Sequence, residues 1–89
     1  MYLADKSVGW CLNNNGLDQQ EGYSMFPDPL EEIACLETCH TMRKHFKITG
    51  CEHNFYGACT FHTRPISNGS GHKGYTCWVM KKDRILTRK

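Results

Sequence analysis

The chain has 89 residues, a formal net charge of +2 and six cysteines, and hydrophobic residues make up 39% of its composition. This length suits one domain, residues 1–89, and the absence of a run of about 20 apolar residues excludes a membrane-spanning helix. An even number of cysteines in so short a chain is typical of a disulfide framework formed in an oxidising compartment, because a small core leaves little stability by itself.

The charged residues are unevenly distributed along the chain. Residues 1–37 carry seven acidic groups and one lysine, whereas residues 38–89 carry ten basic groups and two acidic ones. Either the two halves neutralise each other across the fold, or the second half faces an anionic partner. The first residues lack the apolar stretch of a signal peptide, so a secreted protein would already have lost its signal.

The first third of the chain predicts a strand and a loop. Residues 1–10 alternate weakly between apolar and polar side chains, as in a strand that leads to Cys11. Residues 12–22 are polar and contain Asn15-Gly16, the strongest turn dipeptide in the chain, so we expect a loop. Residues 23–26 follow as a short extended segment.

A helix is predicted at about residues 29–46. Asp28 suits its N-cap, Pro29 suits the first helical position and Glu31 completes a capping box. Basic residues near the end suit the helix dipole, and Gly50 offers a stop. One apolar stripe of this helix is expected to be buried. It consists of Cys35, Cys39, Met42 and Phe46, flanked by Ile33.

Three short strands are expected after the helix, because aromatic and β-branched residues gather there between glycines. They are residues 51–56, 58–63 and 75–80, with Gly57 as a turn and residues 81–89 as a basic tail. The expected fold class is therefore α+β, with one α-helix packed on a small antiparallel β-sheet and three disulfides.

The order of cysteines and elements resembles the six-cysteine type of the PAN/apple domain family. One cysteine follows a strand, a C-x3-C pair lies on the helix, and three more cysteines lie on strands. The segments that carry the resemblance are Gly9–Cys11, Cys35–Cys39, Gly50–His53, Ala58–His62 and Tyr75–Trp78, so that it covers about residues 9–80.

The cysteine spacing alone leaves the pairing open, but the PAN/apple resemblance implies one. In that pairing Cys11 joins Cys77, between the terminal strands. Cys35 joins Cys59 and Cys39 joins Cys51, and both bridges pin the helix to the sheet. Eleven residues separate Cys39 from Cys51, a longer spacing than is usual in the family.

Catalysis is not expected, because six paired cysteines leave no thiolate nucleophile and the serines lack a recognisable nucleophile elbow. The acidic pair Glu31-Glu32 is explained by the helix dipole. Zinc in place of disulfides is an alternative, although the paired C-x2-C motifs of structural zinc sites are absent. Its ligands would come from Cys35, Cys39, His40, Cys51, His53, Cys59 and His62. We expect no metal and no cofactor.

Two regions are candidates for ligand binding. The basic end of the helix, together with Lys73, Lys81 and Lys82, suits sulfated glycans. The polar loop before the last strand suits neutral sugars, which would lie beside the rings of Trp10 and Tyr56. The simpler interpretation is solvated charge for the basic residues and a core position for Trp78. The candidate ligand-binding residues are Arg43, Lys44, Lys47, His62, Arg64, Asn68, Ser70, His72, Lys73, Tyr75 and Trp78.

The function expected from these features is that of a secreted or extracellular, non-catalytic and lectin-like module that binds neutral or sulfated glycans. The alternatives are a protein–protein interaction or cell-adhesion module and a secreted, anti-adhesive, toxin-like effector. The modest net charge and the cysteines argue against nucleic acid as a partner. Asn68-Gly-Ser70 also matches the N-glycosylation pattern, and a glycan there would block the loop. The sequence indicates no oligomeric state.

Overall fold

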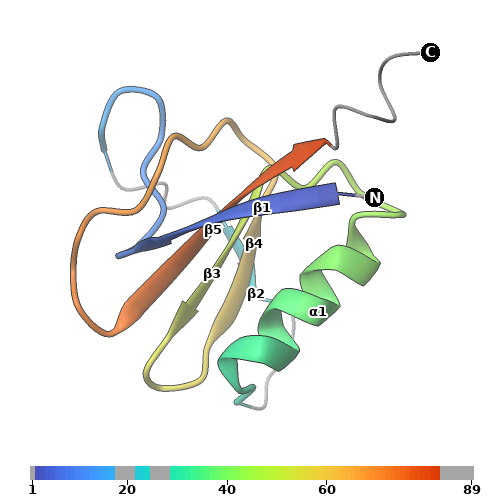
Figure 1. Cartoon of the computed structure of the whole chain (residues 1–89), viewed down its shortest axis with the longest axis horizontal. Coiled ribbons are helices and arrows are strands. Elements are labelled where there is room, and N and C mark those ends of the chain that lie inside the picture. The colour runs from blue at the N-terminus through green and yellow to red at the C-terminus, as the bar shows by residue number, and fades with distance from the viewer. Residues whose placement is uncertain (1, 18–21, 25–28, 83–89) are drawn as a thin grey trace.

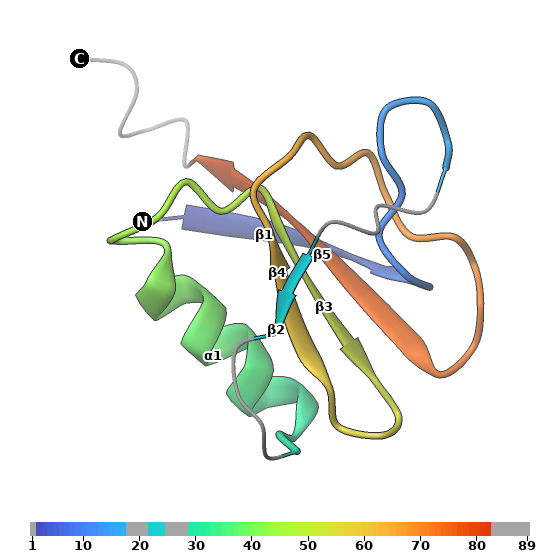
Figure 2. The same cartoon turned by 180° about the vertical axis from the view of Figure 1, so that it is seen from behind.

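The computed structural model describes residues 2–17, 22–24 and 29–82. Within this part of the chain one α-helix packs on one antiparallel sheet with the strand order β1-β5-β3-β4-β2 (Figures 1 and 2). The elements are β1 (Tyr2–Val8), β2 (Gly22–Ser24), α1 (Glu32–Met42), β3 (Gly50–Asn54), β4 (Cys59–His62) and β5 (Tyr75–Lys82). The expected α+β class with three disulfides is confirmed.

The sheet brings distant parts of the chain together. β1 pairs with β5 along its whole length, from Tyr2 opposite Lys82 to Val8 opposite Thr76. β3 lies between β5 and β4, and the tight turn at Gly57, with a φ of +88°, joins β3 to β4 as predicted. The first and last strands are therefore neighbours in space.

The two faces of the sheet have separate cores, because successive side chains of a strand point to opposite faces. On β5, Trp78 and Met80 point toward α1, whereas Cys77 and Val79 point to the other face. The core on the helix side contains Cys35, Cys39, Ile48, Cys51, Cys59, Trp78 and Met80. The smaller core on the other face contains Cys11, Cys77 and Ile66, which lies in the long loop before β5.

The helix begins later than the sequence predicted. Its N-cap is Glu31, with φ −71° and ψ 160°, and the glutamate carboxylate makes no capping hydrogen bond. The preceding residues are extended because the Leu30 N–H donates to the Gly57 carbonyl at 2.9 Å. Pro29 packs so closely on this turn that a Cβ at Gly57 would lie 2.6 Å from Pro29 Cβ. The predicted capping box with Glu31 at N3 is therefore wrong, and Asp28 lies outside the described residues.

The helix also ends earlier than predicted, at Met42. The N–H groups of Lys44 and His45 donate to carbonyls three residues back, which tightens the last turn and ends the helix. Phe46 then leaves the buried stripe and is 51% exposed, and Ile33 is 68% exposed. The burial predicted for Phe46 and Ile33 is therefore wrong, and Gly50 is the first residue of β3 rather than the helix stop.

Three disulfides tie the elements together, in the pairing that the PAN/apple resemblance implies. Cys11–Cys77 joins the segment after β1 to β5, and Cys35–Cys59 and Cys39–Cys51 join α1 to β4 and β3. All six cysteines are in these bridges. Three disulfides indicate folding in an oxidising compartment. In the described part of the chain no helix has the length and hydrophobicity needed to cross a membrane.

Candidate ligand-binding groove

Five ring side chains form a continuous row at the end of the sheet where β5 begins. We call Trp10, Phe55, Tyr56, His72 and Tyr75 the aromatic row. The Trp10 ring lies 4.1 Å from the His72 ring and 5.2 Å from the Tyr75 ring, between centroids. Phe55 continues the row, 6.2 Å from Tyr75 and 4.1 Å from Tyr56. Phe55 and Tyr56 are 64% and 74% exposed and His72 is exposed as well, so both ends of the row face solvent.

The turn between β3 and β4 carries the exposed rings of Phe55 and Tyr56. The Asn54 side-chain carbonyl accepts hydrogen bonds from the backbone N–H groups of Tyr56 and Ala58, which fixes the turn. The Phe55 N–H donates to the Gly74 carbonyl at 2.9 Å, and a Cβ at Gly74 would lie only 2.7 Å from Phe55 Cδ1. The absence of a side chain at Gly74 therefore leaves the space that the Phe55 ring occupies.

The other end of the row is positioned by Ser70. Its hydroxyl oxygen accepts hydrogen bonds from the backbone N–H of Trp10, at 3.2 Å, and of His72, at 3.3 Å. The Ser70 N–H in turn donates to the Trp10 carbonyl at 2.9 Å. Ser70, a predicted ligand-binding residue, thus holds Trp10 and His72 together, with their rings tilted by 31°.

A groove of about 480 Å³ runs beside the aromatic row, between the start of β5, the end of β3 and the first turn of α1. Its wall is apolar on the side of Val8, Phe55 and Tyr75 and carries charged or polar groups elsewhere. The lining residues are Lys6, Val8, Glu32, His53, Asn54, Phe55, Lys73, Gly74, Tyr75 and Thr76.

Glu32 is the acidic group of the groove, and its carboxylate is held by two donors. The Thr76 hydroxyl donates at 2.8 Å and the Lys6 ammonium at 3.1 Å. The hydrogen bond from Thr76 and then that from Lys6 lower the pKa of Glu32 below its ordinary value of 4.5. The carboxylate is therefore ionised at neutral pH, where it serves as a hydrogen-bond acceptor.

His53 lines the groove and ties β3 to the segment before α1. Its Nε2 lies 2.6 Å from the Leu30 carbonyl oxygen. A carbonyl can only accept, so Nε2 carries a proton and donates. The hydrogen bond fixes the ring and leaves Nδ1 as the acceptor of the neutral form.

The predicted ligand-binding residues divide into two separate groups. His72, Lys73 and Tyr75 lie in the aromatic row or the groove. The second group, which we call the basic end, lies near the C-terminal end of α1, roughly 16 Å along the helix axis from the groove. The Arg64 carbonyl accepts a hydrogen bond from the Thr49 hydroxyl, and the Lys81 ammonium pairs with the Asp5 carboxylate at 2.6 Å. The basic end comprises Arg43, Lys44, Lys47, Arg64 and Lys81.

Two predicted ligand-binding residues are buried and so do not reach a ligand at the surface. Trp78 is 3% exposed in the core on the helix side, because the alternation along β5 points it toward α1. His62 is 1% exposed on the opposite face of the sheet. Their assignment to a surface site is corrected accordingly. Asn68 is exposed, but its carbonyl accepts the Leu12 N–H as the loop packs against the segment after β1.

Several groove residues did not appear among the predicted site residues. Lys6 and Glu32 are 26 residues apart in the chain and meet only because the fold brings the first turn of α1 close to β1. Phe55 was assigned to a strand, yet it lies in the turn after β3. The sequence signal that could have revealed it is the pair Phe55-Tyr56 directly before Gly57, since two large rings beside a turn glycine are rarely buried together.

Comparison with known protein families, with curated proteins and with solved structures finds no match for this chain. Its function is therefore inferred from its own residues.

Proposed function

We propose that this chain is an extracellular, non-catalytic recognition module of the PAN/apple type, and that it binds carbohydrate in the groove beside the aromatic row. The observation that carries the proposal is the exposure of the Phe55 and Tyr56 rings next to fixed polar groups. Ring faces cover the apolar C–H groups of a sugar, while carboxylate, ammonium and amide groups bind its hydroxyls.

The polar side of the groove supports binding rather than catalysis. Thr76 and Lys6 hold the Glu32 carboxylate in place, and the lowered pKa makes it a poor general acid at neutral pH. All six cysteines are in disulfides, so no thiolate nucleophile is available in the oxidised protein. The cysteine order and the disulfide pairing support the PAN/apple assignment. One bridge joins β5 to the segment after β1, and the other two join α1 to the sheet.

The separation of the groove from the basic end distinguishes two classes of glycan. A neutral sugar fits the groove, where the charge of Lys6 is paired with Glu32 and Lys73 is the one other lysine or arginine among the described lining residues. A sulfated glycan fits the basic end, with Arg43, Lys44 and Lys47 exposed or half-buried near the end of α1. We assign the primary site to the groove and a neutral sugar, because the aromatic row lies there.

The test is a glycan array of neutral and sulfated sugars at two salt concentrations, using the oxidised protein. Selective binding of neutral sugars that varies little with salt is expected. Phe55→Ala and Tyr56→Ala are each expected to weaken binding about tenfold, or ~1.4 kcal/mol. Phe46→Ala is the matched control, since Phe46 is also exposed but lies at the other end of the helix, stacked on Phe61.

Three outcomes contradict the assignment to the groove. Steep salt dependence together with loss of binding in Lys44→Ala/Lys47→Ala would move the site to the basic end. Equal weakening by Phe46→Ala would show a general effect on folding. No binding by folded, oxidised protein would exclude carbohydrate and favour a protein partner, for which an exposed aromatic patch is also suited.

A further inference from the structure

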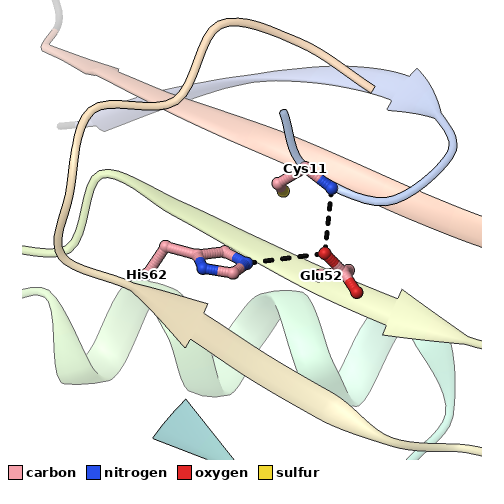
Figure 3. A group of neighbouring side chains, drawn as sticks. All are labelled: Cys11, Glu52 and His62. Atoms are coloured by element: carbon pink, nitrogen blue, oxygen red, sulfur yellow. Dashed lines mark hydrogen bonds and ion pairs between the residues drawn. The ribbon is translucent and has the colours of Figure 1, made fainter. Parts of the chain in front are cut away.

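A second group of polar side chains lies on the sheet face opposite α1, away from the groove. Cys11 from the segment after β1, Glu52 from β3 and His62 from β4 converge there, with their ligand atoms all within 4.8 Å of one another (Figure 3). Cys77 joins them, because its sulfur is bonded to that of Cys11 and it stands opposite Glu52 in the β3–β5 register. We call these four residues the buried cluster.

The buried cluster is shielded from solvent and holds an imidazole with poorly satisfied nitrogens. Cys11 and Cys77 are fully buried and His62 is 1% exposed. Within the described residues neither ring nitrogen of His62 makes a hydrogen bond, and Nε2 lies 3.4 Å from Glu52 Oε1. Leaving a buried polar group without hydrogen bonds is unfavourable, because it has lost its contacts with water and gained none in return. A histidine at this position is therefore poorly explained by the oxidised fold alone.

We propose that the Cys11–Cys77 disulfide masks a zinc site, and that reduction of this bridge allows both thiolates, Glu52 and His62 to bind one Zn²⁺. Sulfur, imidazole nitrogen and carboxylate oxygen are the ligand types that zinc prefers. Bond lengths of about 2.0–2.3 Å place the ligand atoms of a tetrahedral site roughly 3.3–3.8 Å apart. The ligand atoms of Cys11, Glu52 and His62 already lie within 4.8 Å of one another, and after reduction the two bonded sulfurs must move apart to complete that geometry.

The step that opens the site requires a dithiol reductant, which supplies two electrons. One thiolate of the dithiol attacks a sulfur of the bridge and forms a mixed disulfide, and its second thiol closes a disulfide within the reductant. Both cysteines leave as thiols with one added proton each. Zn²⁺ then displaces these two protons as it binds the thiolates, and the metal stays divalent throughout.

Backbone contacts hold the frame that carries the four ligands in addition to the bridge. Glu52 pairs with Thr60 on one side and with Cys77 on the other in the sheet register. The segment after Cys11 is held by the Leu12 N–H, which donates to the Asn68 carbonyl, and by the Ser67 N–H, which donates to the Leu12 carbonyl, both at 2.8 Å. The proposal does not rest on glycan binding, because none of the four ligands lines the groove.

The test on the unmodified chain is site-resolved alkylation. The protein is reduced with dithiothreitol, freed of reductant without air, and treated with iodoacetamide with or without Zn²⁺, and each cysteine is followed by peptide mass mapping. Zn²⁺ is expected to slow modification of Cys11 and Cys77 at least about tenfold, and EDTA to abolish the protection. Protection of other cysteines instead, equal protection of all six, or no protection would overturn the proposal.

Variants test the ligand set with Co²⁺ as a spectroscopic probe of thiolate coordination. After reduction, Cys35→Ala/Cys59→Ala is expected to keep the thiolate-to-cobalt absorption band, and Cys11→Ala/Cys77→Ala to lose it. His62→Gln is expected to lower the affinity at least about tenfold, because loss of a ligand should exceed loss of a partner that merely orients one. His45→Gln is the matched control, since His45 is exposed and lies outside both proposed sites. A band that persists in Cys11→Ala/Cys77→Ala contradicts the site. Where a variant fails to fold, the alkylation of the unmodified chain decides.

Discussion

Removal of the Cys11–Cys77 bridge is expected to destabilise the oxidised protein more than removal of Cys39–Cys51. The first bridge joins residues 66 apart in sequence and the second joins residues 12 apart. The loop entropy that a bridge removes from the unfolded chain gives about 4 kcal/mol for the longer loop and about 3 kcal/mol for the shorter one. All four sulfurs are fully buried, so the lost packing is similar and largely cancels in the comparison.

Urea unfolding of the Cys11→Ala/Cys77→Ala and Cys39→Ala/Cys51→Ala proteins, followed by tryptophan fluorescence, measures this difference. The retained Cys35–Cys59 bridge shortens the longer loop, which lowers its contribution by only a few tenths of a kcal/mol, since the dependence is logarithmic. The Cys11→Ala/Cys77→Ala protein should therefore be less stable by about 1 kcal/mol. Equal stability, or a larger loss in Cys39→Ala/Cys51→Ala, would refute the reasoning from loop length.

Two further predictions concern the groove. Gly71→Ala should lower the free energy of unfolding in urea by about 1 kcal/mol, because Gly71 has a φ of +91° but open space around the added Cβ. Gly74 has a similar φ of +89°, but a Cβ there would lie 2.7 Å from Phe55 Cδ1. Gly74→Ala should therefore lower the free energy of unfolding by more and also weaken glycan binding. Because the pKa of Glu32 is lowered from 4.5, its contribution to stability is fully present above about pH 4.5 and is lost as the pH falls through the lowered value. The free energy of unfolding should thus fall less between pH 6 and pH 3 in Glu32→Gln than in the unmodified chain. The difference between the two losses should be below about 1 kcal/mol, because Glu32 is partly exposed.

The elements of the fold were predictable from local patterns, and their ends were not. Alternation and turn glycines located the strands, and the PAN/apple resemblance implied the cysteine pairs that the structure contains. The helix start was predicted wrongly because the N–H of Leu30 binds the Gly57 carbonyl, a contact between residues far apart in sequence. Capping preferences describe only the neighbouring residues, so such a tertiary hydrogen bond overrides them.

The candidate site was less predictable than the fold, because four separate segments build it. The sequence pointed to His72, Lys73 and Tyr75, which lie at the groove or in the aromatic row. It could not show that Glu32 meets Lys6 and Thr76, since that contact depends on how α1 lies across β1 and β5. Exposed charge was a poor guide too, because the basic residues near the end of α1 lie away from the aromatic row.

The Cys11–Cys77 bridge lies between the proposed glycan groove and the buried cluster, so that its redox state affects both. Trp10 of the aromatic row directly precedes Cys11, and Thr76 of the groove directly precedes Cys77. Because side chains alternate along β5, Thr76 turns toward Glu32 and α1 while Cys77 turns toward Glu52 and the buried cluster. The bridge therefore anchors the segment that carries Trp10 and blocks the proposed metal ligands, and its reduction would free both sulfurs. On this reasoning the proposed glycan binding belongs to the oxidised protein and the proposed zinc binding to its reduced form.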